Sequence, residues 1–147
     1  NMVLAGILSK PNQSLYDTLI IDAGRSEGIV SGERVFALGN VPIGRIAEVY
    51  QNSAKVVLFS SPGETTEVVV SKNVFMQAVG RGGGNFEIIL VKDLVLTPGT
   101  EVALPGLTAY VLGIVKTTIS DPREAFQKAL LVSPVNIQEL KLVQVEI

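Results

Sequence analysis

The stretch TLIIDAGRSEGIVSGERV, residues 18–35, decides the fold class of this chain. It opens with an apolar, β-branched segment, Thr18–Ile21, which is typical of a strand. Gly24, Gly28 and Gly32 then recur every four residues, and glycine at this density indicates a backbone that turns or passes close to a neighbour. Neither a Gly-Lys-Ser/Thr motif nor a helical period follows, as a phosphate-binding loop would require. We therefore predict a structural hinge at these three glycines, turning one strand into the next.

The composition favours β-structure and excludes several kinds of chemistry. Hydrophobic residues make up 47% of the 147 residues and aromatic residues only 5%. The apolar content is mostly Val, Ile and Leu, which favour pleated sheet. Histidine and cysteine are both absent, which removes the commonest general base, disulfides and thiolate chemistry. No apolar run approaches the roughly 18 residues that predict a membrane-spanning helix.

Charged residues are few and scattered, with 12 Lys/Arg and 14 Asp/Glu giving a net charge of −2. No basic cluster could neutralise a phosphate backbone, so we expect no nucleic-acid partner. A metal site would need carboxylates alone, and the nearest grouping, Asp17, Asp22 and Glu27, lacks the spacing of a calcium loop. We therefore predict no metal and no cofactor.

About twelve short apolar segments, separated by Gly, Pro, Asn and Ser, predict an all-β chain. Two sites, 121–124 and 136–139, have the pattern of a helix start. An eleven-residue helix at 121–131 is the alternative, but we expect a single helical turn at each site, followed by a strand. The run Gly80–Asn85 predicts a hairpin loop and the most flexible connection of the chain. A weak internal repeat, in which a Lys-led strand ends in Ser-Pro at 55–62 and again at 128–134, indicates two similar units.

These observations predict two small six-stranded β-barrels packed together, an arrangement that leaves few strand edges unpaired. The repeat favours a contiguous barrel formed by residues 34–91. Residues 1–33 and 92–147 would then form the second, discontinuous barrel. A simple split near residue 62 is the alternative.

Several motifs occur in a characteristic order: TLIIDAG, SEGI and SGERV within 18–35, PIGRIAEVY at 42–50, SAKVVLFSSPG at 53–63 and SPVNIQELKLVQVEI at 133–147. In order and spacing they resemble the extracytoplasmic β-domain of the rod shape-determining protein MreC family. The resemblance implies two small β-barrels. It also implies a non-enzymatic scaffold of the bacterial cell-wall elongation machinery, which maintains rod shape through protein–protein interaction.

The resemblance further implies an extracytoplasmic location, in the periplasm or on the outer face of the cell membrane. We expect a single transmembrane helix and a coiled coil to precede Asn1 in the full-length protein. The implied partners are an elongation-type penicillin-binding transpeptidase, other membrane proteins of the elongation complex and further copies of the chain. The matching motifs are turn glycines and core aliphatic residues, so they transfer no partner-binding residue.

Partner-binding residues are therefore predicted from the residues themselves. Some strands, such as Ile88–Val91, are apolar at consecutive positions, so both of their faces favour burial and an interface beyond the core is expected. Aromatic side chains are frequent interface anchors. We predict Tyr50, Phe75, Phe86 and Tyr110 as partner-binding, the alternative for each being that it fills a barrel.

Two other functions stay open. Paired β-barrels also build chymotrypsin-like proteases, but their triad needs a histidine. The remaining hydrolytic arrangement is a Ser–Lys dyad, with Ser60, Ser61 or Ser133 beside Lys55 or Lys128. A small-ligand-binding β-barrel would need an open apolar cavity, whereas barrels this small are expected to be filled by side chains.

Overall fold

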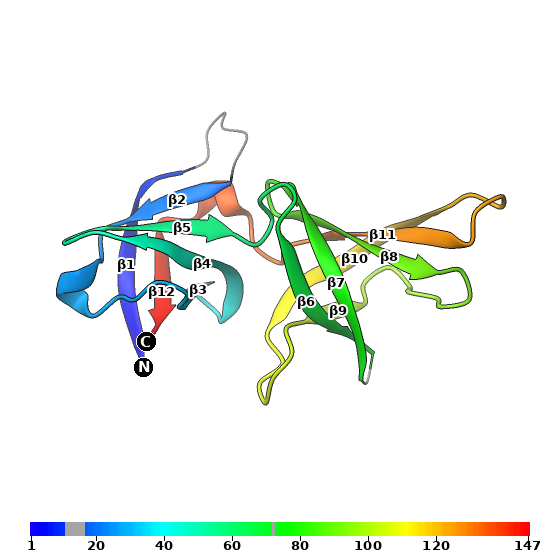
Figure 1. Ribbon diagram of the computed structural model, residues 1–147, viewed down its shortest axis with the longest axis horizontal. Helices are drawn as coiled ribbons and strands as arrows, with labels where there is room; N and C mark the ends of the chain where they lie inside the picture. Colours follow the sequence, from blue (N-terminus) through cyan, green and yellow to red (C-terminus); the bar gives the residue numbers. More distant parts are fainter. Residues whose placement is uncertain (11–16, 72) are drawn as a thin grey trace.

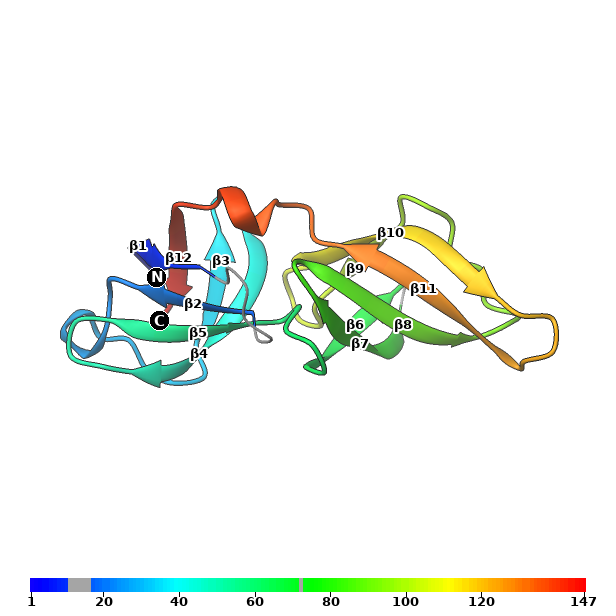
Figure 2. The ribbon, with the colours of Figure 1, turned by 90° about the horizontal axis from the view of Figure 1, so that it is seen from above.

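The structure is a computed structural model that describes residues 1–10, 17–71 and 73–147. Within these residues the strands form two closed antiparallel barrels, and the only other regular elements are two 3-10 turns. The barrels lie end to end along the longest axis of the molecule (Figures 1 and 2). The predicted all-β fold with two six-stranded barrels is confirmed.

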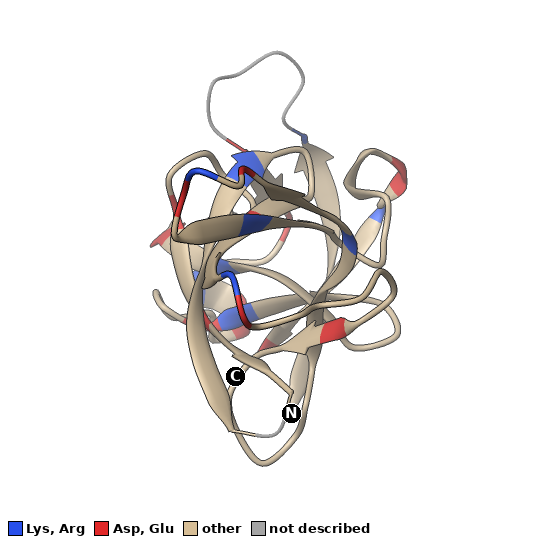
Figure 3. Cartoon of the chain, turned by 90° about the vertical axis from the view of Figure 1, so that its right-hand side faces the viewer, with Lys and Arg blue, Asp and Glu red and all other residues tan. Residues whose placement is uncertain are grey.

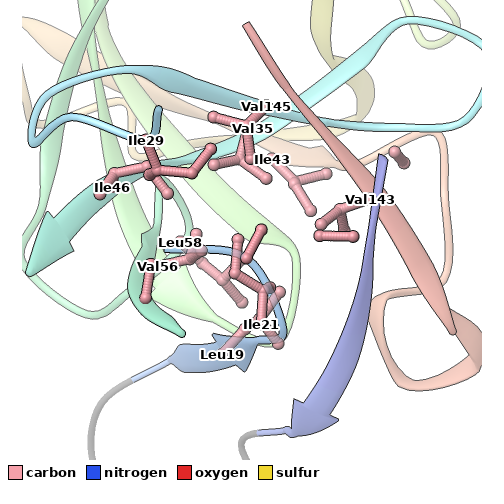
Figure 4. Packing of buried hydrophobic residues seen from close by; sticks show 14 of the residues in the cluster. Leu19, Ile21, Ile29, Val35, Ile43, Ile46, Val56, Leu58, Val143 and Val145 are labelled. Atoms are coloured by element: carbon pink, nitrogen blue, oxygen red, sulfur yellow. The ribbon is translucent and has the colours of Figure 1, made fainter. Parts of the chain in front are cut away.

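The first barrel is built from both ends of the chain. Its strands follow the order β1-β12-β3-β4-β5-β2. Alternate side chains point inward, as in β5, where Ala54, Val56 and Leu58 are buried while Lys55 and Val57 are partly exposed. Aliphatic side chains from every strand meet inside the barrel (Figure 4). The strands are β1 Met2–Ser9, β2 Thr18–Ile21, β3 Arg34–Ala37, β4 Val41–Val49, β5 Ala54–Leu58 and β12 Leu142–Glu146.

The second barrel is contiguous in sequence and has its own apolar core. Its order is β10-β11-β8-β7-β6-β9, and the ring closes through one pair, Val69 of β6 with Ala103 of β9. Buried apolar side chains, among them Phe86, Leu112 and Leu131, occupy its interior. The strands are β6 Thr65–Val70, β7 Val74–Gly82, β8 Asn85–Val91, β9 Glu101–Ala103, β10 Val111–Ser120 and β11 Phe126–Val132.

The division of the chain between the barrels differs from the prediction. Strand β5 pairs with β2, from Thr18 opposite Val57 to Ile21 opposite Ala54. Strands β3, β4 and β5 therefore stay with β1 and β2, and the predicted division into 34–91 and 1–33 plus 92–147 is wrong. The chain leaves the first barrel between β5 and β6, near residue 62, and returns between β11 and β12. A Ser-Pro pair, at 61–62 and again at 133–134, marks each crossing.

The predicted helical turns have different outcomes. The 3-10 turn η2, Ile137–Glu139, confirms the turn at 136–139, and the Asn136 side chain caps it by accepting a hydrogen bond from Gln138 N–H at 3.0 Å. Residues 121–124 form instead a tight turn between β10 and β11, in which Glu124 N–H donates to the carbonyl of Asp121. The pairing of β11 with β8 along its whole length overrides the local helix signal there.

Two of the three glycines of the 18–35 stretch, Gly24 and Gly28, flank a 3-10 turn, η1, Arg25–Glu27, which we did not predict from the sequence. A Cβ at Gly24 would lie 2.4 Å from the carbonyl oxygen of Tyr50, so only glycine fits there. Gly28 and Gly32 have φ of +84° and +93°, the left-handed region that glycine favours. Residues 22–33 thus connect β2 to β3 within one barrel. The hinge predicted at Gly24, Gly28 and Gly32 stays a prediction.

Candidate functional site

The four aromatic residues predicted as partner-binding lie in different environments. Tyr50 and Phe75 are exposed, by 44% and 59%. The Tyr50 hydroxyl donates to the Glu48 carboxylate at 2.5 Å, and this hydrogen bond raises the pKa of Tyr50. Phe86 is only 3% exposed and packs in the core of the second barrel, so that part of the prediction is wrong. The reason is strand parity, because Phe86 lies on the inward face of β8.

Tyr110 lies at the junction between the barrels. Its ring packs edge-on against Phe36 of β3, with centroids 4.8 Å apart and planes at 61°. The Arg34 guanidinium lies 5.5 Å and 5.4 Å from the two ring centroids, and it also donates to Glu146 at 2.7 Å. Phe36 is fully buried, yet it belongs to neither barrel core. The contact with Tyr110 therefore ties the outer face of the first barrel to the second barrel.

Exposed apolar side chains gather on the outer face of the sheet formed by β8, β11 and β10. Phe126 of β11 pairs with Val91 of β8, while Lys128 pairs with Ile89 on one side and with Ile119 on the other. We call Ile89, Val91, Ile119 and Phe126 the distal patch. Each of these four side chains is more than half exposed. The hairpin of β10 and β11 ends at the tip of the molecule furthest from the first barrel (Figure 1).

Charged side chains of both signs surround the distal patch. A surface hollow of about 520 Å³ lies over it, and Arg81, Lys128, Asp121 and Glu124 are among its lining residues. The Asp121 carboxylate accepts hydrogen bonds from Arg123, which lowers the pKa of Asp121. Acidic and basic residues are interspersed over this end of the molecule, without a field of one sign (Figure 3). An apolar floor with a mixed polar rim is the pattern of a protein-binding surface.

The consecutive apolar residues of β8 are the sequence feature that indicated an exposed apolar surface here. Ile88 and Leu90 point into the barrel, while Ile89 and Val91 point outward. Phe126 was not among the residues predicted as partner-binding. The sequence thus indicated that both faces of β8 favour burial, but not which neighbouring strands would complete the outer surface.

The geometry does not support a Ser–Lys nucleophile. The Ser60 hydroxyl is hydrogen-bonded to a buried carboxylate, and the Ser133 hydroxyl accepts a backbone N–H. Ser61 and Lys55 line one hollow of about 610 Å³, but no hydrogen bond joins their side chains in the part of the chain that the structure describes. Lys128 lies 3.9 Å from a glutamate carboxylate. Among the described residues, none of the three serines therefore makes a hydrogen bond to a lysine side chain.

The three carboxylates that lie near one another in the sequence, Asp17, Asp22 and Glu27, do not form a common metal site in the fold. Asp22 accepts from Gly6 N–H at 2.6 Å, and Glu27 accepts from Gly24 N–H at 2.7 Å. Among residues 1–10, 17–71 and 73–147, no group of three acidic side chains is arranged to hold a metal ion. Within the same ranges there is also no helix with the length and apolar character needed to cross a membrane.

A family model described as "Rod shape-determining protein MreC, barrel core" matches residues 7–146, which include the whole second barrel, both crossings and all of the first barrel except most of β1 and the last residue of the chain. The chain belongs to the MreC family. The resemblance seen in the motifs is thereby confirmed, and the name of the family ties this chain to the determination of rod shape. A comparison with curated protein sequences finds no match.

Solved MreC structures share the fold. MreC from Pseudomonas aeruginosa superimposes with a TM-score of 0.90 at 20% identity, covering 100% of this chain and 99% of that one. MreC of Listeria monocytogenes gives 0.79 at 21%, covering 99% and 74%. A complex between penicillin-binding protein PBP2 and MreC from Helicobacter pylori gives 0.61 at 12%, covering 100% of both chains. At these identities the structural likeness shows that the fold of two barrels is common to the MreC proteins.

Proposed function

We propose that this chain is a non-enzymatic scaffold of the cell-wall elongation machinery that acts outside the cytoplasm and maintains rod shape by binding partner proteins. Membership of the MreC family supports the role in cell shape. The Helicobacter pylori relative in complex with PBP2 supports an elongation-type penicillin-binding transpeptidase as a partner. The observation that carries the proposal is the distal patch, where four apolar side chains stand exposed on a closed barrel.

The distal patch is suited to protein binding because its side chains are already in position. Val91 and Phe126 lie opposite each other on paired strands, so little ordering entropy is lost when a partner covers them. Lys128 lies between Ile89 and Ile119, with the Glu87 carboxylate 3.9 Å away. A charge pair at the rim of an interface adds little affinity. Its main effects are to fix how the partner is aligned on the surface and to disfavour partners with the wrong charge pattern.

Substituting Phe126→Asp is expected to weaken the complex with the transpeptidase by about 30-fold, because an aromatic anchor of an interface contributes about 2 kcal/mol. Sedimentation velocity of the chain mixed with the extracytoplasmic part of an elongation-type penicillin-binding transpeptidase measures this. Val30→Asp is the matched control, since Val30 is similarly exposed, at 59%, but belongs to the first-barrel half of the chain.

Two further variants locate the site if it lies elsewhere. Tyr50→Asp and Phe75→Asp test the exposed aromatic residues predicted from the sequence. Equal affinity of the Phe126→Asp variant and the unsubstituted chain, together with a loss for Tyr50→Asp, would move the site to the first barrel. Failure of the unsubstituted chain to bind at any concentration would contradict the partner assignment.

The proposed scaffold role includes association with further copies of the chain. It also includes binding to other membrane proteins of the elongation complex. In this proposal a single transmembrane helix anchors the full-length protein. A second group of exposed apolar side chains supports self-association. Leu142 of β12 pairs with Gly6 of β1, which lies between the exposed Leu4 and Leu8. Met2 is exposed further along β1, opposite Glu146. Sedimentation equilibrium of the chain alone over a concentration series tests this. A monomer at every concentration would contradict it.

A further inference from the structure

A buried polar contact joins the two barrels at Asp17, the residue before β2, which is only 7% exposed. Its carboxylate oxygen Oδ2 accepts two hydrogen bonds, from the Ser60 hydroxyl at 3.0 Å and from Gly83 N–H at 2.5 Å. The Ser60 hydroxyl, which donates a hydrogen bond to Asp17, in turn accepts one from Gly84 N–H at 3.0 Å. We call Asp17, Ser60, Gly83 and Gly84 the inter-barrel clamp.

The clamp connects parts of the molecule that belong to different barrels. Asp17 is fixed to the first barrel, because its carbonyl accepts Leu58 N–H of β5 at 3.0 Å. Gly83 and Gly84 form the tip of the hairpin between β7 and β8 in the second barrel. Ser60 lies on the outgoing crossing between them. The Asp17 carboxylate of the first barrel thus binds the hairpin tip of the second barrel in two ways. It contacts Gly83 directly, and it contacts Gly84 through the Ser60 hydroxyl of the crossing.

Backbone hydrogen bonds attach the same hairpin tip to both crossings. Gly82 N–H donates to the carbonyl of Ser60 at 2.6 Å, and Ser133 N–H donates to the carbonyl of Gly84 at 2.7 Å. The predicted hairpin at Gly80–Asn85 is confirmed, but Gly84 is buried and its backbone bonds both crossings. A run of glycines that suggested a flexible loop is therefore the joint between the barrels.

A buried carboxylate is costly unless hydrogen bonds replace the water that it loses. At the clamp two of the bonds come from the second barrel: Gly83 N–H donates to Asp17, and Gly84 N–H donates to the Ser60 hydroxyl. These two bonds exist only in one relative orientation of the barrels. Hydrogen bonds to a charged acceptor are also stronger than those between neutral groups. When Asp17 is separated from the hairpin tip it must return to water, and the barrels are then held together by the two crossings and by the contact between Phe36 and Tyr110.

We propose that the inter-barrel clamp is a conformational lock. When it is engaged, it sets a single orientation of the second barrel relative to the first. When it is released, the second barrel swings about the crossings at Ser60–Pro62 and Ser133–Pro134. The lock thereby determines how the distal patch is placed relative to the first barrel. This inference rests on the clamp geometry alone and does not depend on the identity of any partner.

The test is an inter-barrel distance measurement, and the absence of cysteine from the chain makes site-specific labelling direct. Spin labels are attached to cysteines introduced by Val30→Cys in the first-barrel half and Thr117→Cys on β10, both at exposed positions. Pulsed electron spin resonance then gives the distribution of distances. We expect one narrow peak for the unsubstituted background and a broadened or split distribution after Asp17→Ala.

The matched control is Asp22→Ala, because Asp22 also accepts a backbone N–H, from Gly6, but entirely within the first barrel. Its distribution is expected to coincide with the unsubstituted one. Asp17→Asn keeps an oxygen for both donors and is expected to stay close to a single peak. Ser60→Ala, which leaves the carboxylate in place, is expected to broaden the distribution as Asp17→Ala does. A narrow, unshifted distribution in both folded alanine variants would overturn the proposal.

Discussion

Replacing Gly80 with alanine is expected to lower the free energy of unfolding by about 3 kcal/mol, because overpacking against immobile atoms is destabilising. An added Cβ would lie 2.2 Å from the carbonyl oxygen of Ser61, 2.6 Å from the carbonyl carbon of Ser60 and 2.8 Å from the carbonyl oxygen of Phe59. All three are backbone atoms of the outgoing crossing, so no side-chain rotation relieves the contact. The methyl group would have to push β7 away from the crossing.

Urea unfolding measures this effect, and Gly39→Ala is the control. Gly39 has φ of +92° and open space around its Cβ position, so its substitution is expected to cost about 1 kcal/mol through backbone strain alone. Gly80 has no such strain, since its φ lies outside the left-handed region. A loss at Gly80 no larger than that at Gly39 would show that β7 and the crossing are not closely packed in solution.

Phe36→Ala is expected to cost about 3 to 4 kcal/mol, the range for removing a fully buried phenylalanine. The ring of Phe36 is covered by Tyr110 at 4.8 Å and by the Arg34 guanidinium at 5.5 Å. Since it belongs to neither core, its removal leaves both barrel interiors packed and weakens the junction. We therefore expect unfolding to become less cooperative, with two transitions resolved by calorimetry where the unsubstituted chain gives one.

Phe75→Ala removes the same ring from an exposed position, at 59%, and is expected to change the stability by no more than about 0.5 kcal/mol. The comparison separates the loss of a buried junction from the loss of an aromatic side chain as such. A single sharp transition in the Phe36→Ala chain, with a loss like that of Phe75→Ala, would contradict the role assigned to this contact.

Local sequence patterns predicted the fold class because the barrels are built from strands with a plain period of two. In β12 the buried Val143 and Val145 alternate with the less buried Gln144 and Glu146, and this alternation is visible in the sequence itself. The division between the barrels was not predictable in the same way, since it depends on β5 pairing with β2. A pairing between distant strands leaves little local trace. Only the repeated Ser-Pro pair marked the places where the chain crosses.

The candidate sites show a similar limit. Phe75 and Phe86 are the same residue type in neighbouring strands, but one is exposed and the other is in the core. Their burial follows from which face of the strand is inward, and register with distant strands decides that. Asp17 and Gly83 were both considered in the sequence, Asp17 as one of three neighbouring carboxylates and Gly83 as part of a hairpin loop. Their hydrogen bond spans 66 positions, and no spacing rule connects them.

The pairing of β1 with β12 has a consequence for the order in which the chain acquires its structure. Met2 lies opposite Glu146, so the first barrel cannot close until the final strand has been synthesised. The second barrel is complete once Val132 has emerged, because all of its strands lie between Thr65 and Val132. Folding during synthesis proceeds from the first complete unit. The inserted barrel therefore forms first, and the hairpin tip that carries Gly83 is in place before the barrel that receives it closes.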